Sequence, residues 1–417
     1  MTDPQKTKSG LFYRIAPGIL IAATGVGAGD LITASIAGSN VGVVIAWAAL
    51  AGGILKWMLN EGLARWQLAT DTTLLEGWND RLGSPVRWVF VTYLLIWSVF
   101  TGGALISACG VAGAGIYDLG LSVQHAKIVW GIIHSLLGLT LVWIGGFALF
   151  EKLMSVCIGI MFCAVIATAV LIKPDWSAVA LGIIKPTFKG DDTKFVLGVL
   201  GGVGGSVTLL SYGYWIREAG RKGISGLRDS RVDLAIGYTM TSLFGVAMLM
   251  IGSRLKLEPG GENVAIELAA QLEGVMGTFG KWLFLIGFWG AVFSSLLGVW
   301  QSIPYLFADF MLIRSGASAN QRRDIDYTKT KSYRAFLIGL AVVPILMTNI
   351  SLQKVQIYYA VMAAMFMPFL AATLLIMNNR TAWVGKQYKS GILTNVLLML
   401  CVLFFIYVGY NEFFGDG

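Results

Sequence analysis

The sequence predicts an all-α, polytopic membrane protein that crosses the bilayer about eleven times and consists of two related halves. Three observations support this fold class. Apolar residues make up 56% of the 417 residues and charged residues only 13%, whereas soluble proteins carry about 25% charged residues. Long apolar segments recur along the whole chain. Two of these segments are interrupted by runs of glycine at corresponding places in the two halves.

Each of the apolar segments is close to the ~20 residues that a helix needs to cross a bilayer. Runs of this length satisfy their backbone groups in lipid only as helices. The expected spans are 16–38, 42–64, 88–115, 126–146, 150–172, 195–216, 232–253, 280–306, 333–350, 354–377 and 391–411. In the loop 254–279, apolar residues at helical spacing predict an amphipathic helix on the outer surface. No loop is long enough for a soluble catalytic domain, so we do not expect an enzyme.

The distribution of positive charge predicts the orientation. With the N-terminus inside, 21 of the 31 Lys and Arg residues fall in cytoplasmic segments and nine fall outside. The positive-inside rule then predicts a plasma-membrane protein with a cytoplasmic N-terminus and an external C-terminus. The net charge of +8 follows from this bias and gives no reason to expect nucleic acid as a partner. The expected partner is the lipid bilayer, and a monomer is favoured.

The two glycine runs predict the arrangement of the halves. The first contains Gly25, Gly27 and Gly29 and precedes Asp30, and the second covers residues 201–205. Paired glycine-broken spans point to the central site of a secondary transporter. Each break heads a group of five spans, and an odd number means that the second group runs in the opposite direction. We therefore expect a LeuT-type inverted 5+5 repeat: a cytoplasmic tail 1–15, repeats 16–172 and 195–377, and an eleventh helix 391–411.

The two breaks are also the predicted substrate site, because an unwound helix exposes carbonyl groups that bind cations. Asp30 and Thr208 would supply the metal-binding oxygens, and a site of oxygens without sulfur favours hard cations such as Mg²⁺ or Mn²⁺. Other expected binding residues are Gly27, Gly205 and Ser211. The expected hinges are Gly25, Gly29, Gly202 and Gly204.

Simpler interpretations of the same residues remain open. Asp30 stands where a helix N-cap is preferred, and the glycines suit close helix packing. Lys56, inside the second span, is a possible charge partner of Asp30, and such a neutral pair would disfavour a cation site. Glu61 and Arg65 are four residues apart and predict an ion pair.

Side chains after the second break allow another cargo. Tyr212, Tyr214 and Trp215, together with Phe366, would suit a small organic solute or a monovalent cation, or they simply pack. His134 is expected to be a satisfied polar residue and not a proton relay. The cysteines lie in apolar segments and are expected to be inert buried thiols: Cys109, Cys157, Cys163 and Cys401.

Several short motifs occur in the same order as in a known family. They are Ala16–Leu20 with Gly29–Thr33, Leu59–Thr70, Gly204–Val207, Met367–Phe369, and Gly385 with Leu393–Val396. Over residues 16–400 this order resembles the Nramp family of proton-coupled divalent-metal transporters. The resemblance implies alternating-access transport of a divalent cation, without a cofactor.

The departures from that family concern its functional residues. Where the family has Asp-Pro-Gly-Asn, this chain has Gly27-Ala28-Gly29-Asp30, and Thr208-Leu209-Leu210 replaces Met-Pro-His. The third span has no Asp or Glu between residues 88 and 117, where the family carries acidic proton-path residues. Phe366 stands where the family usually has a glutamine. We therefore expect metal transport without the family's proton coupling.

Overall fold

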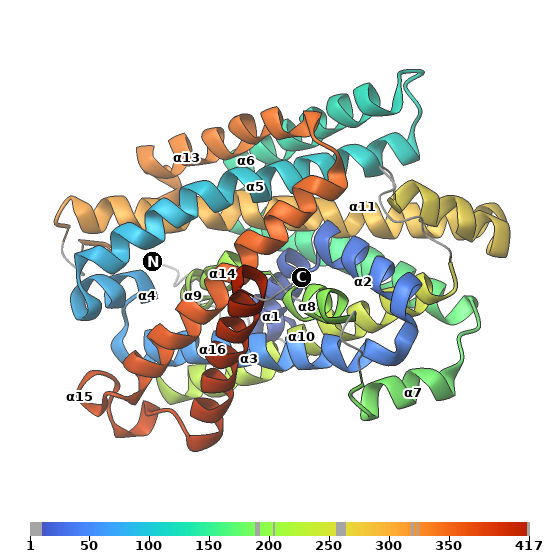
Figure 1. The fold of residues 1–417 in the computed structure, drawn as a ribbon. Helices are drawn as coiled ribbons and strands as arrows, with labels where there is room; N and C mark the ends of the chain where they lie inside the picture. The colour runs from blue at the N-terminus through green and yellow to red at the C-terminus, as the bar shows by residue number, and fades with distance from the viewer. Residues whose placement is uncertain are drawn as a thin grey trace.

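The computed structural model describes residues 11–187, 192–202, 205–255, 264–317, 321–322 and 325–414, and this part of the chain contains helices and no strand (Figure 1). Eight of its segments are long and apolar enough to cross a membrane. Three shorter apolar helices accompany them: Ala16–Gly25, Met365–Asn379 and Ile392–Tyr407. The all-α, polytopic fold class predicted from the sequence is confirmed.

The first half of the chain starts with two helices that together form one interrupted crossing. Its elements are α1 (Leu11–Gly25), α2 (Ala28–Val41), η1 (Gly42–Ile45), α3 (Ala46–Thr70), α4 (Leu74–Gly77), η2 (Trp78–Leu82), α5 (Ser84–Ile116) and α6 (Val123–Leu171). The long α6 contains two candidate spans, which correspond to the fourth and fifth expected segments.

The second half also starts with an interrupted crossing, formed by α8 and α9. Its elements are α7 (Trp176–Ile184), α8 (Thr193–Gly202), η4 (Val207–Leu210), α9 (Ser211–Glu218), α10 (Gly223–Ser253), α11 (Val264–Arg314), η5 (Tyr327–Lys329), α13 (Lys331–Val342), η6 (Val343–Asn349), α14 (Leu352–Asn379), α15 (Thr381–Val384), η7 (Lys386–Tyr388) and α16 (Ile392–Phe414).

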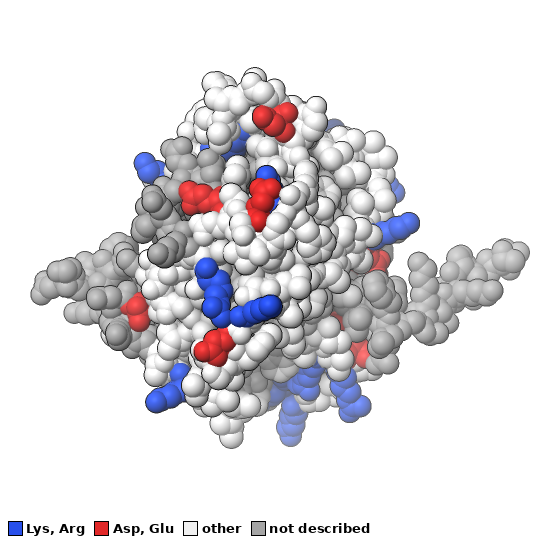
Figure 2. Space-filling view, turned by 90° about the vertical axis from the view of Figure 1, so that its right-hand side faces the viewer, with Lys and Arg blue, Asp and Glu red and all other residues white. Residues whose placement is uncertain are grey.

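The helix ends define two opposite faces of the molecule. The α4 face, at the left of Figure 1, carries α4, α15 and the C-terminal end of α11. The α7 face, at the right, carries α7 and the connection from α5 to α6. Figure 2 looks onto the α7 face, where acidic and basic side chains are interspersed among uncharged ones. We use these two names below because they do not depend on the orientation in the membrane.

Some local expectations need revision. The amphipathic segment of the 254–279 loop is the first part of α11, which bends at Gly277 (φ 68°). Leu268 and Leu272 of this segment are fully buried, so it packs on the protein and does not lie free on the surface. Cys163 was expected to be buried, but it lies on the outward-facing side of α6 and is exposed. The other three cysteines are buried, as expected.

The predicted ion pair of the second span is confirmed. Arg65 Nη2 lies 2.5 Å from Glu61 Oε1 on α3, and Arg231 Nε of α10 donates to the same oxygen at 2.9 Å. Arg65 Nη1 also donates to the carbonyl of Tyr388 at 3.0 Å. The pair therefore links α3 to α10 and to η7 at the α4 face, and it is more than a local contact within one helix.

Helix α10 packs against α2 through a close crossing of the two backbones. A Cβ atom added at Gly252 would overlap the carbonyl oxygen of Ser35, and one added at Gly38 would overlap the carbonyl oxygen of Leu249. Small residues allow such close approach, which is the main source of helix association within a bilayer. This crossing fixes α2, the second half of the interrupted helix, on a long and mostly buried helix.

We expect Gly252→Val to destabilise the protein by about 1–3 kcal/mol, because the larger side chain must push α2 away from α10. Thermal unfolding in detergent, followed by tryptophan fluorescence, measures the change. Gly339→Val is the matched control, since a Cβ atom at Gly339 of α13 meets no atom within 4 Å. Equal melting temperatures of the two variants would contradict the expectation.

Candidate functional site

The first helical break lies between α1 and α2, at Val26 and Gly27. A helix end leaves carbonyl groups without intrahelical donors, and inside a bilayer no bulk water replaces those donors. Two consecutive serines of α11 supply them. Ser294 Oγ donates to the Ala23 carbonyl at 2.9 Å, and Ser295 Oγ lies 2.8 Å from the Val26 carbonyl oxygen. These two serines therefore stabilise the break.

The second break follows α8, which ends at Gly202, and the described chain resumes at Gly205 with φ 75°. Lys56 Nζ of α3 donates to the carbonyl of Gly201 at 2.7 Å, and only 2% of Lys56 is exposed. A cation at the C-terminal end of a helix complements the helix dipole. Trp97 Nε1 of α5 donates to Ser206 Oγ at 3.0 Å just after the break.

The two breaks lie against each other. A Cβ atom built on Gly205 would be 3.5 Å from the Cα atom of Gly25, and it would overlap Oγ1 of Thr208. The positive φ and this close approach both require glycine at position 205. The sequence-based expectation that the unwound parts of the first and sixth crossings meet therefore agrees with the geometry.

A cavity opens at this junction. It is lined from α1, α2, α5, η4, α11 and α14. Its lining includes Thr24, Thr101, Thr208 and Gln356, and the rings of Trp97 and Tyr359. Together with Ser295 of α11, these side chains come from five separate stretches of the chain.

Three oxygen atoms in this lining are buried without a hydrogen-bond partner among the described residues. They are Thr24 Oγ1, Thr101 Oγ1 and Gln356 Oε1. The three side chains are only 4%, 3% and 6% exposed. An unsatisfied buried polar group costs about 1–3 kcal/mol, so the cavity is chemically suited to a ligand or ordered water that brings a positive charge or a donor.

The structure brings most of the predicted residues to the junction. Gly25, Gly27, Gly29 and Thr208 line the cavity, and Gly205 contacts Thr208 next to it. Gly202 is the last residue of α8. Gly204 and the side chain of Asp30 lie outside the described part of the structure, and the backbone of Asp30 belongs to the first turn of α2.

Other predicted residues lie elsewhere. Ser211 is fully buried, and its hydroxyl has no described partner, but it does not line the cavity. Lys56 lies at the second break, where Gly201 is a described partner of its ammonium group. The ammonium group of Lys56 therefore binds a carbonyl at the C-terminal end of α8. From the sequence, we expected the carbonyl groups at this break to bind the substrate. The two carbonyl ends are thus unequal: serine hydroxyls stabilise the first and a resident cation the second.

The aromatic side chains that the sequence offered for an organic cargo do not line the cavity. Tyr212 donates to Asp233 at 2.6 Å and Trp215 to Gln301 at 3.0 Å, so both are held inside the packed core. Phe366 stacks on Tyr93, with ring centroids 5.8 Å apart. The cavity instead contains Trp97 and Tyr359. The packing interpretation of the earlier aromatic residues therefore agrees with the structure.

His134 has both ring nitrogens engaged. Nδ1 lies 2.7 Å from the carbonyl oxygen of Trp130, and Nε2 accepts from Trp289 Nε1 at 3.0 Å. This arrangement fits a neutral ring with its proton on Nδ1. The residue is a satisfied polar group, as expected from the sequence.

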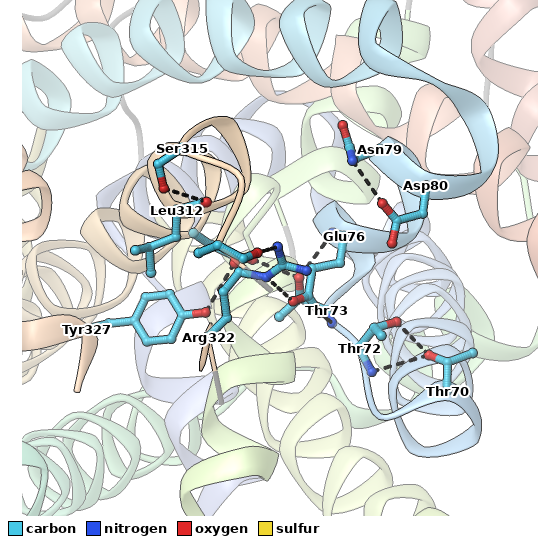
Figure 3. A network of polar contacts seen from close by, with 12 residues as sticks. Thr70, Thr72, Thr73, Glu76, Asn79, Asp80, Leu312, Ser315, Arg322 and Tyr327 are labelled. Atoms are coloured by element: carbon cyan, nitrogen blue, oxygen red, sulfur yellow. Dashed lines mark hydrogen bonds and ion pairs between the residues drawn. The ribbon is translucent and has the colours of Figure 1, made fainter. Parts of the chain in front are cut away.

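A second polar cluster lies at the α4 face of the molecule. The fully buried carboxylate of Asp309, at the end of α11, accepts from Thr73 Oγ1 at 2.7 Å, Tyr214 OH at 2.9 Å and Tyr327 OH at 3.1 Å. Figure 3 shows Thr73 and Tyr327 converging from the start of α4 and from η5. Because Tyr214 belongs to α9, this cluster ties the second half of the broken sixth crossing to α4 and α11.

The start of α4 strengthens the same cluster. Thr73 and Glu76 form a capping box, in which Thr73 N–H donates to Glu76 Oε2 at 2.6 Å. Arg322 Nε donates to the other oxygen of Glu76 at 2.7 Å (Figure 3). Two buried carboxylates are thus held by hydroxyl, amide and guanidinium donors at one end of the molecule.

The sequence reasoning missed the residues that make the cavity polar. Thr24, Thr101 and Gln356 are isolated polar side chains in apolar spans, and their spacing carries no motif. The adjacent pair Ser294 and Ser295 was a usable signal, because two consecutive hydroxyls in an apolar helix need acceptors. Among the described side chains, no group of three His, Cys, Asp or Glu residues is placed to hold a metal.

Comparison with known proteins identifies the family. The model of the Nramp family, natural resistance-associated macrophage protein-like, matches residues 18–414. "Divalent metal cation transporter MntH" of Chromohalobacter salexigens is 23% identical over 425 residues, covering 96% of this chain and 91% of that protein. A manganese transporter of Eremococcus coleocola, solved with an aromatic bis-isothiourea compound, gives a TM-score of 0.71 at 18% identity and covers 100% of this chain and 90% of that one.

The fold is shared more widely than the sequence. A Na⁺-coupled sialic acid symporter in an outward-open state gives a TM-score of 0.62 at 14% identity, covering 96% of this chain and 90% of that one. Such structures support the LeuT-type fold inferred from the two broken crossings. Because the family model matches almost the whole length of the chain, residues 18–414, the chain belongs to the Nramp family.

Proposed function

We propose that this protein is a secondary transporter that moves a divalent metal cation across the membrane by alternating access. The observation that carries the proposal is the set of three buried, unpartnered oxygens where the two helix breaks meet. Hydroxyl and amide oxygens that accept no hydrogen bond in the described structure have lone pairs available to coordinate a cation. The names of the relatives, divalent metal cation transporters, support the same class of cargo.

The proposed ion is a hard one, Mg²⁺ or Mn²⁺. The cavity lining offers hydroxyl and amide oxygens from Thr24, Thr101, Thr208 and Gln356, and no sulfur atom. Oxygen ligands favour hard cations, and Mg²⁺ commonly keeps several waters while it binds one or two carboxylates. In this proposal Asp30 supplies the carboxylate, and the neutral oxygens contact the ion or its water shell.

Transport is proposed to run without the family's proton coupling. The third crossing, α5, contains no Asp or Glu, and no histidine follows Thr208 at the second break. Lys56 instead places a fixed cation at the end of α8. Movement of the metal down its own gradient is the mechanism that these residues support.

The cavity lies on the α7 side of the junction. Gln124 and Lys127, at the start of α6, donate to the carbonyls of Thr348 and Ile350, which places the start of α14 at the α7 face. Gln356 is in the second turn of α14, and Thr101 is in the second half of α5. With the Asp309 cluster closing the α4 face, we propose that the site communicates with the α7 face in this state. We propose that this face is external, because the positively charged loops are expected on the cytoplasmic side.

A small organic solute or a monovalent cation is the alternative cargo. The observation that favours it is the pair of rings, Trp97 and Tyr359, in a cavity whose described lining is uncharged. Calorimetric titration with Mg²⁺, Mn²⁺ and Ca²⁺, together with liposome flux, separates the two. Binding and flux of at least one divalent ion supports the metal proposal, and no response to any of the three supports the alternative.

In proteoliposomes we expect Mg²⁺ or Mn²⁺ uptake without acidification of the lumen. Asp30→Asn should lower that uptake about tenfold or more, because it removes the proposed charged ligand. Asp175→Asn is the matched control: Asp175 caps the exposed start of α7, and Asn caps a helix equally well. Metal-dependent acidification would contradict uncoupled transport. Unchanged uptake by Asp30→Asn would leave that residue an acidic side chain of the first turn of α2, which begins at Ala28 and not at the N-cap position that the sequence suggested.

Thr101→Val should weaken metal uptake by about tenfold, since it removes an unpartnered oxygen while it keeps the shape of the side chain. Thr140→Val serves as the control, because Thr140 Oγ1 donates to the Leu136 carbonyl on the exposed side of α6. The measurement is the initial rate at a metal concentration below half-saturation. If both variants transport like the parent, the neutral oxygens do not contact the cargo.

Tyr214→Phe should favour opening at the α4 face, because it removes the hydrogen bond between α9 and Asp309. A Thr208→Cys reporter in a Cys163→Ser background can be labelled from either face with an impermeant maleimide. We expect labelling from the α4 face to rise several-fold, and Tyr358→Phe, a change on the exposed side of α14, to leave it unchanged. An unaltered ratio between the faces would show that the Asp309 cluster does not hold the closed state.

A further inference from the structure

Two arginines stack on one aromatic pair at the α4 face. The guanidinium carbon of Arg87, in the first turn of α5, lies 5.6 Å from the ring centroid of Phe310. That of Arg314, the last residue of α11, lies 5.6 Å from the ring centroid of Trp88. The rings of Trp88 and Phe310 meet edge to face at 5.1 Å. The four side chains, called the Arg87–Arg314 site below, therefore form one compact unit contributed by two helices.

Neither arginine has an acidic partner in the described part of the chain. Other arginines near this face do, since Arg322 pairs with Glu76 and Arg65 with Glu61. The Nε atom of Arg87 is buried and makes no hydrogen bond there. Stacking on a ring holds a guanidinium by its flat side and leaves its N–H edge available for a planar or tetrahedral anion.

The position along the helices suggests where such an anion would come from. Arg87 and Arg314 lie at the ends of two candidate membrane spans, Ser84–Ile116 and Ala265–Arg314. Trp88, which is 45% exposed, is of the residue type that is enriched at the boundary between the hydrocarbon and the headgroups.

An exposed apolar stripe continues from this position along α5. Val89, Leu95 and Ile96 are 63%, 47% and 47% exposed. Their spacing, together with Trp88, places them on one side of the helix. A lipid whose phosphate contacts the arginines could lay its acyl chains against this stripe.

We propose that the Arg87–Arg314 site binds the phosphate headgroup of an anionic membrane lipid. Two guanidinium groups with no described acidic partner present a local charge that a zwitterionic headgroup only partly matches, whereas an anionic phospholipid neutralises it. Basic pockets beside transmembrane helices recognise anionic headgroups in this way. The apolar stripe favours a lipid over a soluble phosphate, which could use only the two arginines. This inference does not depend on which cargo the cavity takes.

The test measures lipid-dependent thermal stability of the full-length protein in detergent micelles. Phosphatidylglycerol should raise the melting temperature, and phosphatidylcholine should raise it much less. Arg314→Gln should require roughly fivefold to tenfold more phosphatidylglycerol for the same shift, and Arg87→Gln with Arg314→Gln should require more still, because each arginine contributes about 1 kcal/mol to headgroup binding. Arg314 is exposed, so the single variant is expected to fold even if the double variant does not.

Two controls make the result specific. Lys386→Gln removes an exposed charge at the same face and should keep the parent response to lipid. Soluble sn-glycerol 1-phosphate should neither stabilise the protein nor compete with the lipid. Equal loss of response in Lys386→Gln would indicate general surface charge and overturn the proposal. So would full competition by the soluble phosphate, or equal stabilisation by the two lipids.

Discussion

The satisfaction of backbone groups at the two helix breaks is the constraint on which the rest of the structure depends. Each break frees carbonyl groups at a depth where lipid offers no donors. Ser294 and Ser295 supply donors at the first break and Lys56 at the second. Because these donors come from neighbouring helices, the unwound segments stay open and a cavity remains between them. Close backbone crossings, such as that of α2 with α10, hold the flanking halves in place.

The polar groups in the middle of the molecule are uncharged, whereas those at the α4 face are mostly charged and paired. The described cavity lining is neutral, and its unpartnered oxygens come from α1, α5 and α14. At the α4 face, charged groups are gathered into networks around Asp309, Glu76 and Glu61. Buried charges are stable only when they are paired and hydrogen-bonded, so these networks resist separation. This division agrees with the proposed roles of the two regions, a neutral substrate site in the middle and a charged, tightly paired gate at the α4 face.

The interrupted sixth crossing connects these two regions. Its middle carries Thr208, which lines the cavity, and its second half carries Tyr214, which bonds to Asp309. Thr208 is in η4 and Tyr214 in α9, which follows η4 directly, so one continuous stretch of chain joins the two regions. The Arg87–Arg314 site adds a contact on α11, the helix that also contributes Ser295 and Asp309. Lipid, gate and substrate site are thus proposed to meet on two helices.

The sequence by itself determined the class, the approximate spans and the two breaks, because apolar length and glycine runs report directly on membrane crossing and on backbone freedom. It also predicted the Glu61–Arg65 pair, which is local in the chain. Only the tertiary structure decided which side chains surround the cavity. Thr101 and Gln356 are 255 residues apart, and no periodicity relates them. For the same reason the sequence placed Ser211 at the site although its side chain does not line the cavity, and it left open whether Phe366 packs or faces a cargo. The direction in which a helical side chain points depends on neighbours that packing, and not sequence distance, brings together.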